Sequence, residues 1–333
     1  MSSALNTKKM IKSFPTVLLY IGIILIASCR TEREETPYPD VEFLLEWGVS
    51  GERDGQFDQP IGIAIDDNGF IYISDSENNR IQKFSEFGEL FSKWDSGGSK
   101  ETALQTPMHI TSDGTNIYVT EYGSDRVQKF SPEEKSLMAF GKGDNKNGAL
   151  DAPSGVAVDE SGNVYVTGFY NSSVKKYSPN GEYLIQIGSP GQKEEGKLNY
   201  PTDLAIGKNG NIYVADAYND RIQVFTPEGE FVRKWGDSPP LGNKAAEGSF
   251  NVATGIGIDS EGRVYVADFY NDRIQIFDPE GNFIMSFGKQ GEGEGEFERP
   301  TDVAIDKNGN IYVVDWGNDR VQKLRISWPE QTI

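Results

Sequence analysis

The stretch PTDLAIGKNGNIYVADAYNDRIQVFTPEGEFVRKWG, residues 201–236, decides the fold, because it recurs almost unchanged as PTDVAIDKNGNIYVVDWGNDRVQKL at residues 300–324. Weaker copies begin at other points along the chain, and the six copies start 47, 46, 48, 52 and 47 residues apart. The remaining starts are Pro60, Pro107, Pro153 and Ala253. A period in the forties indicates a repeat protein in which every copy is one supersecondary unit.

Each copy contains four short segments with the alternation of β-strands. In the fourth copy these segments cover residues 203–206, 212–216, 221–225 and 231–236. An Asn-Gly turn separates the first two segments, and a Pro-Glu-Gly turn separates the last two, which is the turn chemistry of tight hairpins. No segment of this length has the apolar spacing of a helix. Four antiparallel strands in each repeat predict one blade of a β-propeller.

The two ends of the chain complement each other. The first full repeat is preceded by VEFLLEWG (41–48), which has the pattern of a fourth strand, and the last repeat ends after its third strand, near residue 328. We therefore predict an all-β fold of six four-stranded blades, closed when residues 43–47 complete the last blade and cover its open edge. The alternative, an open array of hairpins, would not leave complementary fragments at its two ends.

The first 28 residues have the features of an export signal. A basic segment precedes twelve apolar residues, Thr16 to Ala27, which is short for a membrane span. The sequence Ile-Ala-Ser-Cys then resembles a bacterial lipobox with Cys29, the only cysteine, as the lipidated residue. We expect a signal peptide at 1–28, a flexible tether at 29–40 and a propeller at 41–333. A plain signal peptide with an incidental cysteine and a signal-anchor helix are the alternatives.

The residue after the cysteine bears on location. Arg30 occupies the position where an Asp would indicate retention in the inner membrane of some bacteria, so we expect the outer membrane or cell surface of the cell envelope. Contact with the membrane is expected through the lipid anchor only.

The mature chain is strongly acidic. Without the signal peptide it keeps 29 basic and 51 acidic residues, a net charge of −22. This charge argues against nucleic acid and against an anionic membrane surface as partners. It provides solubility, and it also favours divalent cations or cationic ligands. We expect a monomer.

The repeats resemble the NHL repeat. The matching pattern is Pro-x-(Gly/Asp)-(Ile/Val)-Ala-(Ile/Val)-Asp, then Gly-Asn-(Ile/Val)-Tyr-Val-x-Asp, then Asn-Asp-Arg-(Ile/Val)-Gln-x-Phe, over residues 41–328. The resemblance implies a six-bladed propeller, but NHL propellers include lyases, receptor sensor domains, and RNA- or protein-binding platforms. It therefore does not choose among functions.

Two enzyme groups of similar fold have metal sites that cannot be carried over. The amidating lyases hold zinc through Pro-His motifs, whereas no residue directly after the repeat proline is His in this chain. Those residues are Ile61, Met108, Ser154, Thr202 and Thr301. Nothing matches the Glu, Asn and Asp residues that hold the metal of six-bladed lactonases and related hydrolases.

One position of the repeat alternates around the ring. Two residues after the repeat proline, blades one, three and five have Gly, whereas blades two, four and six have His109, Asp203 and Asp302. Alternate blades of a six-fold ring place three side chains in a triangle around the axis. A His and two carboxylates suit Zn²⁺, Mn²⁺ or Fe²⁺, and carboxylates with backbone carbonyls suit Ca²⁺. The alternative is structural: the aspartates cap turns and pair with neighbouring blades, and the only histidine is a polar plug.

A second pair of positions carries opposite charges. An acidic residue ends the second strand and an Arg opens the third strand in five blades, while blade three has Gly168 and Ser173 at these positions. The pairs are Asp75/Arg80, Glu121/Arg126, Asp216/Arg221, Asp268/Arg273 and Asp315/Arg320. We interpret them as structural bridges rather than as a charged ligand ring. Without its bridge, the loop 168–172 of blade three is predicted to be the freest for binding.

Aromatic residues concentrate in the loops between second and third strands. Such rings can form a rim that binds sugars, peptides or a cationic group, or they can pack between neighbouring blades. Blade one has Ser76 and Glu77 there, which predicts a gap in the rim. The candidate ligand-binding residues are Tyr122, Phe169, Tyr170, Tyr218, Phe269, Tyr270 and Trp316.

These features favour a binding module over an enzyme. The sequence has no second histidine, no Gly-x-Ser-x-Gly motif and no phosphate-binding loop. We expect an exported, lipid-anchored module that binds a protein, peptide or glycan at the loop-rich face. The first alternative is a metal-dependent lyase or hydrolase with a divalent cation, Ca²⁺ or Zn²⁺, in the central channel. The second is a structural lipoprotein that uses the propeller rim.

Overall fold

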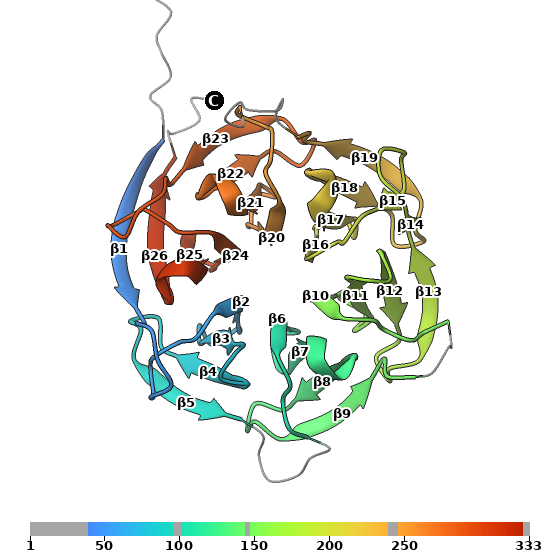
Figure 1. The fold of residues 1–333 in the computed structure, drawn as a ribbon, viewed down its shortest axis with the longest axis horizontal. Helices are drawn as coiled ribbons and strands as arrows, with labels where there is room; N and C mark the ends of the chain where they lie inside the picture. Colours follow the sequence, from blue (N-terminus) through green and yellow to red (C-terminus); the bar gives the residue numbers. More distant parts are fainter. Residues whose placement is uncertain (1–38, 96–101, 144–146, 239–245, 329–333) are drawn as a thin grey trace, which may run out of the picture. The chain divides into compact units, whose positions relative to one another are not determined.

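The computed structural model describes residues 39–95, 102–143, 147–238 and 246–328 of the chain. Six four-stranded antiparallel sheets are arranged around a common centre, as the repeats predict (Figure 1). The first strand of each sheet lines the centre and the fourth forms the outer rim. The signal peptide, Cys29 and the tether up to residue 38 lie outside the described residues.

The strands follow the repeat closely. Blade one has β2 (Pro60–Ile65), β3 (Ile71–Asp75), β4 (Arg80–Phe84) and β5 (Leu90–Trp94). Blade two has β6 (Pro107–Ser112), β7 (Ile117–Glu121), β8 (Arg126–Phe130) and β9 (Ser136–Phe140). Blade three has β10 (Pro153–Val158), β11 (Val164–Gly168), β12 (Ser173–Tyr177) and β13 (Tyr183–Ile187).

The other three blades repeat the same order. Blade four has β16 (Leu204–Ile206), β17 (Ile212–Asp216), β18 (Arg221–Phe225) and β19 (Phe231–Trp235). Blade five has β20 (Ala253–Ile258), β21 (Val264–Asp268), β22 (Arg273–Phe277) and β23 (Phe283–Phe287). Blade six has β24 (Pro300–Ile305), β25 (Asn310–Asp315), β26 (Arg320–Ser327) and, from the other end of the chain, β1 (Asp40–Trp47).

Short elements occupy several loops between the main strands. Single turns of 3₁₀ helix follow the second strand in four blades, namely η1 (Tyr122–Ser124), η2 (Ala217–Asn219), η3 (Phe269–Asn271) and η4 (Trp316–Asn318). A two-residue parallel pair, β14 (Ser189–Pro190) and β15 (Lys197–Leu198), precedes blade four.

Strand β1 closes the ring as predicted. It pairs antiparallel with β26, from Asp40 opposite Ser327 to Trp47 opposite Val321. The last blade is therefore complete, and its third strand does not present an open edge. Since β26 starts beside η4, the register places Asp40 at the opposite end of the blade from η4.

The two faces of the ring have different loops. We call the face that carries the loops before each first strand, and the loops between second and third strands, the mouth face. The opposite face, which carries the tight turns between first and second strands, is the turn face. Strand β1 runs from the turn face towards the mouth face, so the chain enters the propeller on the turn face.

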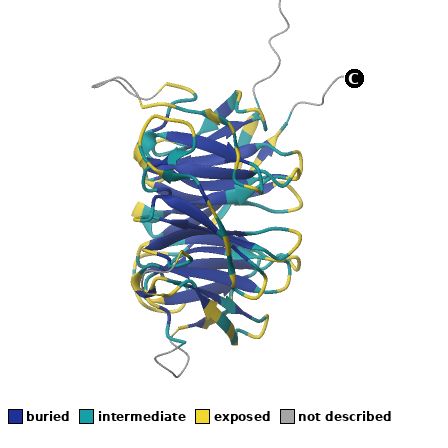
Figure 2. Ribbon diagram, turned by 90° about the vertical axis from the view of Figure 1, so that its right-hand side faces the viewer, coloured by how far each residue is buried: buried dark blue, intermediate teal, exposed yellow. Residues whose placement is uncertain are grey.

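The core lies between the blades. Second and third strands are almost wholly buried, while most residues of the outer strands are half-buried or exposed (Figure 2). The buried residues form six clusters, and each cluster combines side chains of two adjacent blades, such as Tyr213 of blade four with Phe277 of blade five. Burial between neighbouring sheets is the main stabilising contribution in such a fold.

Two sets of polar contacts join every blade to the next at the mouth face. The first set consists of hydroxyl groups that donate to backbone carbonyls of the following blade. These contacts are Ser74 to Met108, Thr120 to Ser154, Thr167 to Thr202, Thr202 to Thr254, Thr254 to Pro300 and Thr301 to Ile61.

The second set uses the residue just before each third strand, which has a left-handed backbone with φ between 47° and 53°. In the motif Asn-Asp-Arg this residue is the Asp, whose short polar side chain tolerates that conformation. Its side-chain oxygen accepts a backbone N–H of the next blade. The contacts are Asn79 with Thr106, Asp125 with Ala152, Ser172 with Tyr200, Asp220 with Val252, Asp272 with Arg299 and Asp319 with Gln59.

No helix within the described part of the chain is long and apolar enough to cross a membrane.

Candidate functional site

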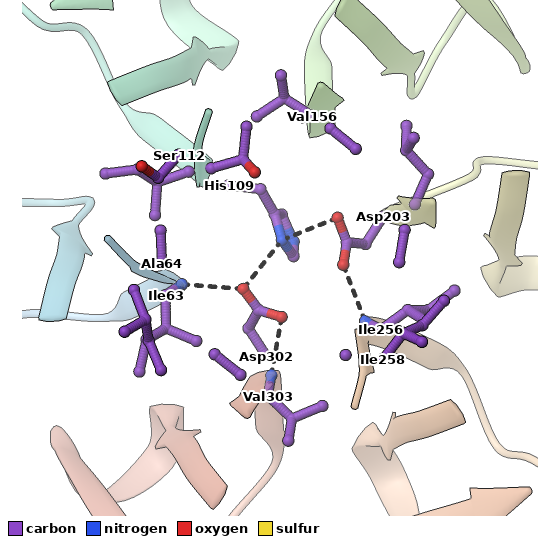
Figure 3. Close-up of a pocket in the computed structure, with 18 of the residues that line it drawn as sticks. Ile63, Ala64, His109, Ser112, Val156, Asp203, Ile256, Ile258, Asp302 and Val303 are labelled. Carbon is purple, nitrogen blue, oxygen red and sulfur yellow. Dashed lines mark hydrogen bonds and ion pairs between the residues drawn. The ribbon is translucent and has the colours of Figure 1, made fainter. Parts of the chain in front are cut away.

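The side chains of His109, Asp203 and Asp302 meet at the centre of the ring (Figure 3). Nδ1 of His109 lies 3.3 Å from Oδ1 of Asp203 and 3.3 Å from Oδ2 of Asp302. One ligand atom from each residue lies within 4.8 Å of the other two, and each residue is 4% exposed. Three alternate blades thus bring one imidazole and two carboxylates together, as the alternation in the sequence predicts.

Backbone N–H groups hold both carboxylates in place. Ile256 N–H donates to Oδ2 of Asp203 over 2.8 Å, and Ile63 N–H donates to Oδ2 of Asp302 over 2.9 Å. Val303 N–H donates to the other oxygen of Asp302 over 2.8 Å. Each aspartate therefore also binds the next blade in the ring, which is the structural role expected from the sequence alternative.

The glycines of the odd blades are required by close packing at this cluster. A Cβ on Gly62 would lie 2.7 Å from Cα of His109, a contact that real Cβ atoms do not make. A Cβ on Gly155 would lie 2.5 Å from Cα of Asp203. Gly255 has the same relation to Asp302, also at 2.5 Å. The alternation of Gly with His or Asp thus has a steric cause. Each larger residue fits because the blade before it has no side chain at the same position.

Burial and neighbouring charges change the pKa values of His109 and Asp203. Burial alone lowers the pKa of His109, but the carboxylates of Asp203 and Asp302 outweigh it and raise that pKa to about 9. Burial raises the pKa of Asp203 to about 7, and the charge of Asp302 adds to this, whereas His109 opposes it. The imidazole is therefore held as a cation between the two acids at neutral pH.

The cluster lies between two cavities on the axis. A cavity of about 270 Å³ is lined by all three residues and by first-strand residues that extend to the turn face, such as Ile65 and Ile305. A second cavity, also of about 270 Å³, lies towards the mouth face and includes His109 but neither aspartate. The reactive groups are thus reached mainly from the turn-face side of the channel.

The five predicted Asp–Arg or Glu–Arg bridges are present. Nε of the Arg lies 2.5–2.8 Å from a carboxylate oxygen in every case, and each carboxylate is fully buried. The guanidinium also donates to carbonyls of the preceding loop: Arg221 binds those of Lys193, Glu194 and Lys197. Burial raises the pKa of Asp216, with the bonds from Asn219, Asn199 and Arg221 opposing it. These contacts fit the structural interpretation.

Blade three replaces its bridge in a different way. Lys175 is 4% exposed, and its ammonium donates to the carbonyls of Asn147 and Ala149 in the preceding loop. Burial lowers the pKa of this ammonium. The loop at 168–172 also keeps backbone hydrogen bonds, from Phe169 N–H to Ala152 and from Tyr170 N–H to Asp151. The loss of the bridge therefore does not detach this loop from the blade.

Aromatic rings form a continuous surface on the mouth face over blades two to four. We call Tyr122, Phe169, Tyr170, Tyr200 and Tyr218 the aromatic surface. The rings of Phe169, Tyr170, Tyr200 and Tyr218 form a connected group with contacting centroids 4.8–6.1 Å apart. The ring of Tyr122 lies 6.2 Å from that of Tyr170, and their hydroxyls are 2.8 Å apart. Tyr170 is 53% exposed and Tyr218 is 57% exposed. The rings thus pack across blades and still face solvent.

A second aromatic group lies over blades five and six. Phe269 contacts both Tyr270 and Trp316, with ring centroids 4.8 and 6.0 Å apart. The Arg299 guanidinium lies 6.0 Å from the Tyr270 centroid and 5.8 Å from that of Trp316. Blade one has Ser76 and Glu77 at the corresponding loop, so it contributes no ring there.

Sequence reasoning missed Tyr200 and Arg299. Both lie directly before the proline that opens the repeat, Pro201 or Pro300, and both have positive φ. The signal was available, because this position is on the same face as the aromatic loops, yet it is not part of the repeat pattern. Comparison of the six copies at that position would have found both residues.

Comparison with known proteins agrees with the fold. Residues 257–324 match a family described as a 6-bladed β-propeller, residues 57–84 and 198–225 match the NHL repeat, and residues 145–168 match a β-propeller repeat. The E3 ubiquitin-protein ligase TRIM71 of Bos taurus is 39% identical over 49 residues, 15% of this chain. The chain spans only 6% of the length of that relative.

Solved structures of similar fold have different functions. A streptogramin B lyase has a TM-score of 0.60 at 15% identity, covering 87% of this chain and 98% of its own. A gluconolactonase from Xanthomonas campestris has a TM-score of 0.61 at 13% identity, covering 88% and 98%. An auxiliary nutrient binding protein from Bacteroides thetaiotaomicron has a TM-score of 0.63 at 12% identity, covering 87% and 77%. These likenesses establish the fold alone.

Proposed function

The chain is a six-bladed β-propeller that carries NHL repeats, and we propose that it works as an exported, lipid-anchored binding module. Its ligand is a protein, peptide or glycan that lies across the aromatic surface of the mouth face. The observation that carries this proposal is the exposure of rings that are already fixed by their neighbours: Tyr170 and Tyr218 are 53% and 57% exposed.

Fixed, exposed aromatic residues are suited to binding. A tyrosine offers a large flat face and a hydroxyl at its edge, and little side-chain entropy is lost when the ring is already packed. Contacts with Phe169 and Tyr200 hold Tyr170 and Tyr218 in this way. Sugars, peptides and protein surfaces all present apolar faces with hydrogen-bonding edges, which fit such a surface.

The topology is consistent with a membrane-anchored platform. The chain enters the propeller on the turn face at Asp40, the start of β1. With lipid on Cys29, the turn face is the one joined to the tether, and the aromatic surface is on the other face.

The proposal is tested by binding measurements on full-length protein in detergent. We would probe immobilised glycans and extracts of the cell envelope with the wild type and with the double variant Tyr170→Ala/Tyr218→Ala. The proposal predicts that the variant loses at least about tenfold in affinity, because truncation of central aromatic contacts costs about 2 kcal/mol or more in binding.

A matched control removes equally exposed apolar side chains from the outer rim. Phe91 in β5 and Leu137 in β9 are 65% and 53% exposed. The double variant Phe91→Ala/Leu137→Ala should bind like the wild type. Loss of binding in the rim variant with normal binding in the tyrosine variant would overturn the proposal and favour a structural lipoprotein that uses its rim.

A further inference from the structure

We propose that His109, Asp203 and Asp302 bind one divalent transition-metal ion in the channel. The site would face the cavity that leads to the turn face, and it does not depend on the aromatic surface. It therefore stands or falls separately from the proposed function.

Two of the three donor separations match those around one ion. Nδ1 of His109 is 3.3 Å from one oxygen of each aspartate, and all three donor atoms lie within 4.8 Å of one another. Metal bonds to nitrogen and carboxylate oxygen are about 2.0–2.2 Å long, so donors of a common ion lie roughly 3–4 Å apart.

The rest of the structure keeps the donors in position. Asp203 uses one oxygen for the N–H of Ile256 and turns the other towards His109. Asp302 is fixed by the N–H groups of Ile63 and Val303. Hydrogen bonds of this kind orient ligating carboxylates in metal sites. The glycines of the odd blades make room for all three residues, so the site is built by six blades.

The donors also indicate the type of ion. One nitrogen and two carboxylate oxygens suit Zn²⁺, Mn²⁺ or Fe²⁺, whereas Ca²⁺ takes six to eight oxygen ligands. Three protein ligands leave coordination positions open, as in sites that bind water or substrate. All three residues line the cavity of about 270 Å³ on the turn-face side, so these positions would face it. The metal-dependent lyase or hydrolase alternative requires such a site.

The first test uses the wild-type chain, because His109 is the only histidine in the protein. Full-length protein made without a histidine tag and labelled with ¹⁵N-histidine gives one set of imidazole signals. We would stabilise the protein in detergent, strip it with EDTA and titrate it with Zn²⁺. Binding at Nδ1 predicts a large change in that nitrogen signal, complete at about one ion per chain. An unchanged imidazole spectrum at saturating Zn²⁺ would overturn the proposal.

The second test measures metal content and affinity in variants. Asp302→Asn and His109→Gln should lower Zn²⁺ and Mn²⁺ affinity by about 10–100-fold or more. The control Asp67→Asn removes the same charge from an exposed residue on the turn face and should keep wild-type affinity. Equal metal content in the wild type, Asp302→Asn and His109→Gln would contradict the assignment. Should a variant fail to fold, the wild-type imidazole spectrum still decides the question.

Discussion

Nδ1 of His109 lies 3.3 Å from Oδ1 of Asp203, so blades two and four meet through one buried ion pair at the centre of the ring. This buried contact has two effects. It stabilises the imidazolium, and it keeps two blades that are distant in the sequence at a fixed separation. The same contact makes the stability of the metal-free protein depend on pH.

Stability should fall as pH rises. In the folded chain the pKa of His109 is raised from 6.5 to about 9, and that of Asp203 is raised from 3.8 to about 7. Because the folded state binds protons more tightly, its stability decreases as pH rises through these values. The contribution of His109 is fully present below pH 6.5 and is lost as pH rises through about 9.

Thermal unfolding in EDTA measures this effect. The difference in unfolding temperature between the wild type and His109→Gln should be largest near pH 6 and should shrink by about pH 10. A chain of this size changes its unfolding temperature by about 2 °C or less for each kcal/mol of stability. A difference that stays constant over this range would show that the imidazole gains no proton affinity on folding.

Substitution of a channel glycine should destabilise the fold. In Gly255→Ala the new Cβ would lie 2.5 Å from Cα of Asp302 and 2.6 Å from the carbonyl oxygen of Thr301, which are backbone atoms and cannot easily move. Overpacking of this kind costs about 1–3 kcal/mol. Gly143→Ala is the control, because no atom lies within 4 Å of its Cβ position. Urea unfolding of both variants measures the difference; equal stabilities would argue against the steric cause of the alternation.

Removal of one partner from a buried bridge should be costly. Asp216→Ala leaves the guanidinium of Arg221 buried without its carboxylate, and such a change costs about 3–5 kcal/mol. The double variant Asp216→Ala/Arg221→Met should recover much of that loss, since it also removes the unpaired charge. Lys93→Ala, which breaks an exposed pair with Asp54, should leave stability unchanged. Chemical denaturation measures the stability of each variant. If Asp216→Ala were as stable as Lys93→Ala, the structural role of the Asp216–Arg221 bridge would be refuted.

Deletion of β1 should open the ring. Without residues 40–47, β26 presents an unpaired edge, which invites pairing with another chain. We expect oligomers or aggregates in size-exclusion chromatography and a broad thermal transition. A chain that begins at Pro39 keeps β1 and should behave as a single compact species. Similar elution of the two proteins would mean that closure by β1 is dispensable.

Much of the fold could be predicted because each repeat contains its own signals. The Asn-Gly turn, the alternating strands and the Asn-Asp-Arg motif recur in the repeats. The Asp of that motif has a structural role: Asp220 has a φ of 51° and accepts the N–H of Val252 in the next blade. The convergence of His109, Asp203 and Asp302 followed from blade order, since position in a closed ring fixes which residues face the axis.

Other features depend on contacts that a repeat pattern does not contain. The buried Lys175 of blade three binds loop carbonyls in place of an Arg that stands two positions earlier in other blades. Tyr200 joins the aromatic surface from a loop before the first strand. Both depend on which side chains of different loops meet in space, and local periodicity does not contain that information.

The central claim is that ligand binds on the aromatic surface, and hydrogen–deuterium exchange of the full-length wild type with and without bound ligand tests it most directly. We predict slower exchange in the loops that carry the aromatic surface, at Tyr122–Ser124, 168–172, Tyr200 and Ala217–Asn219, and unchanged exchange in the outer strands β5 and β9. Protection confined to the outer strands, with no change in these loops, would contradict it.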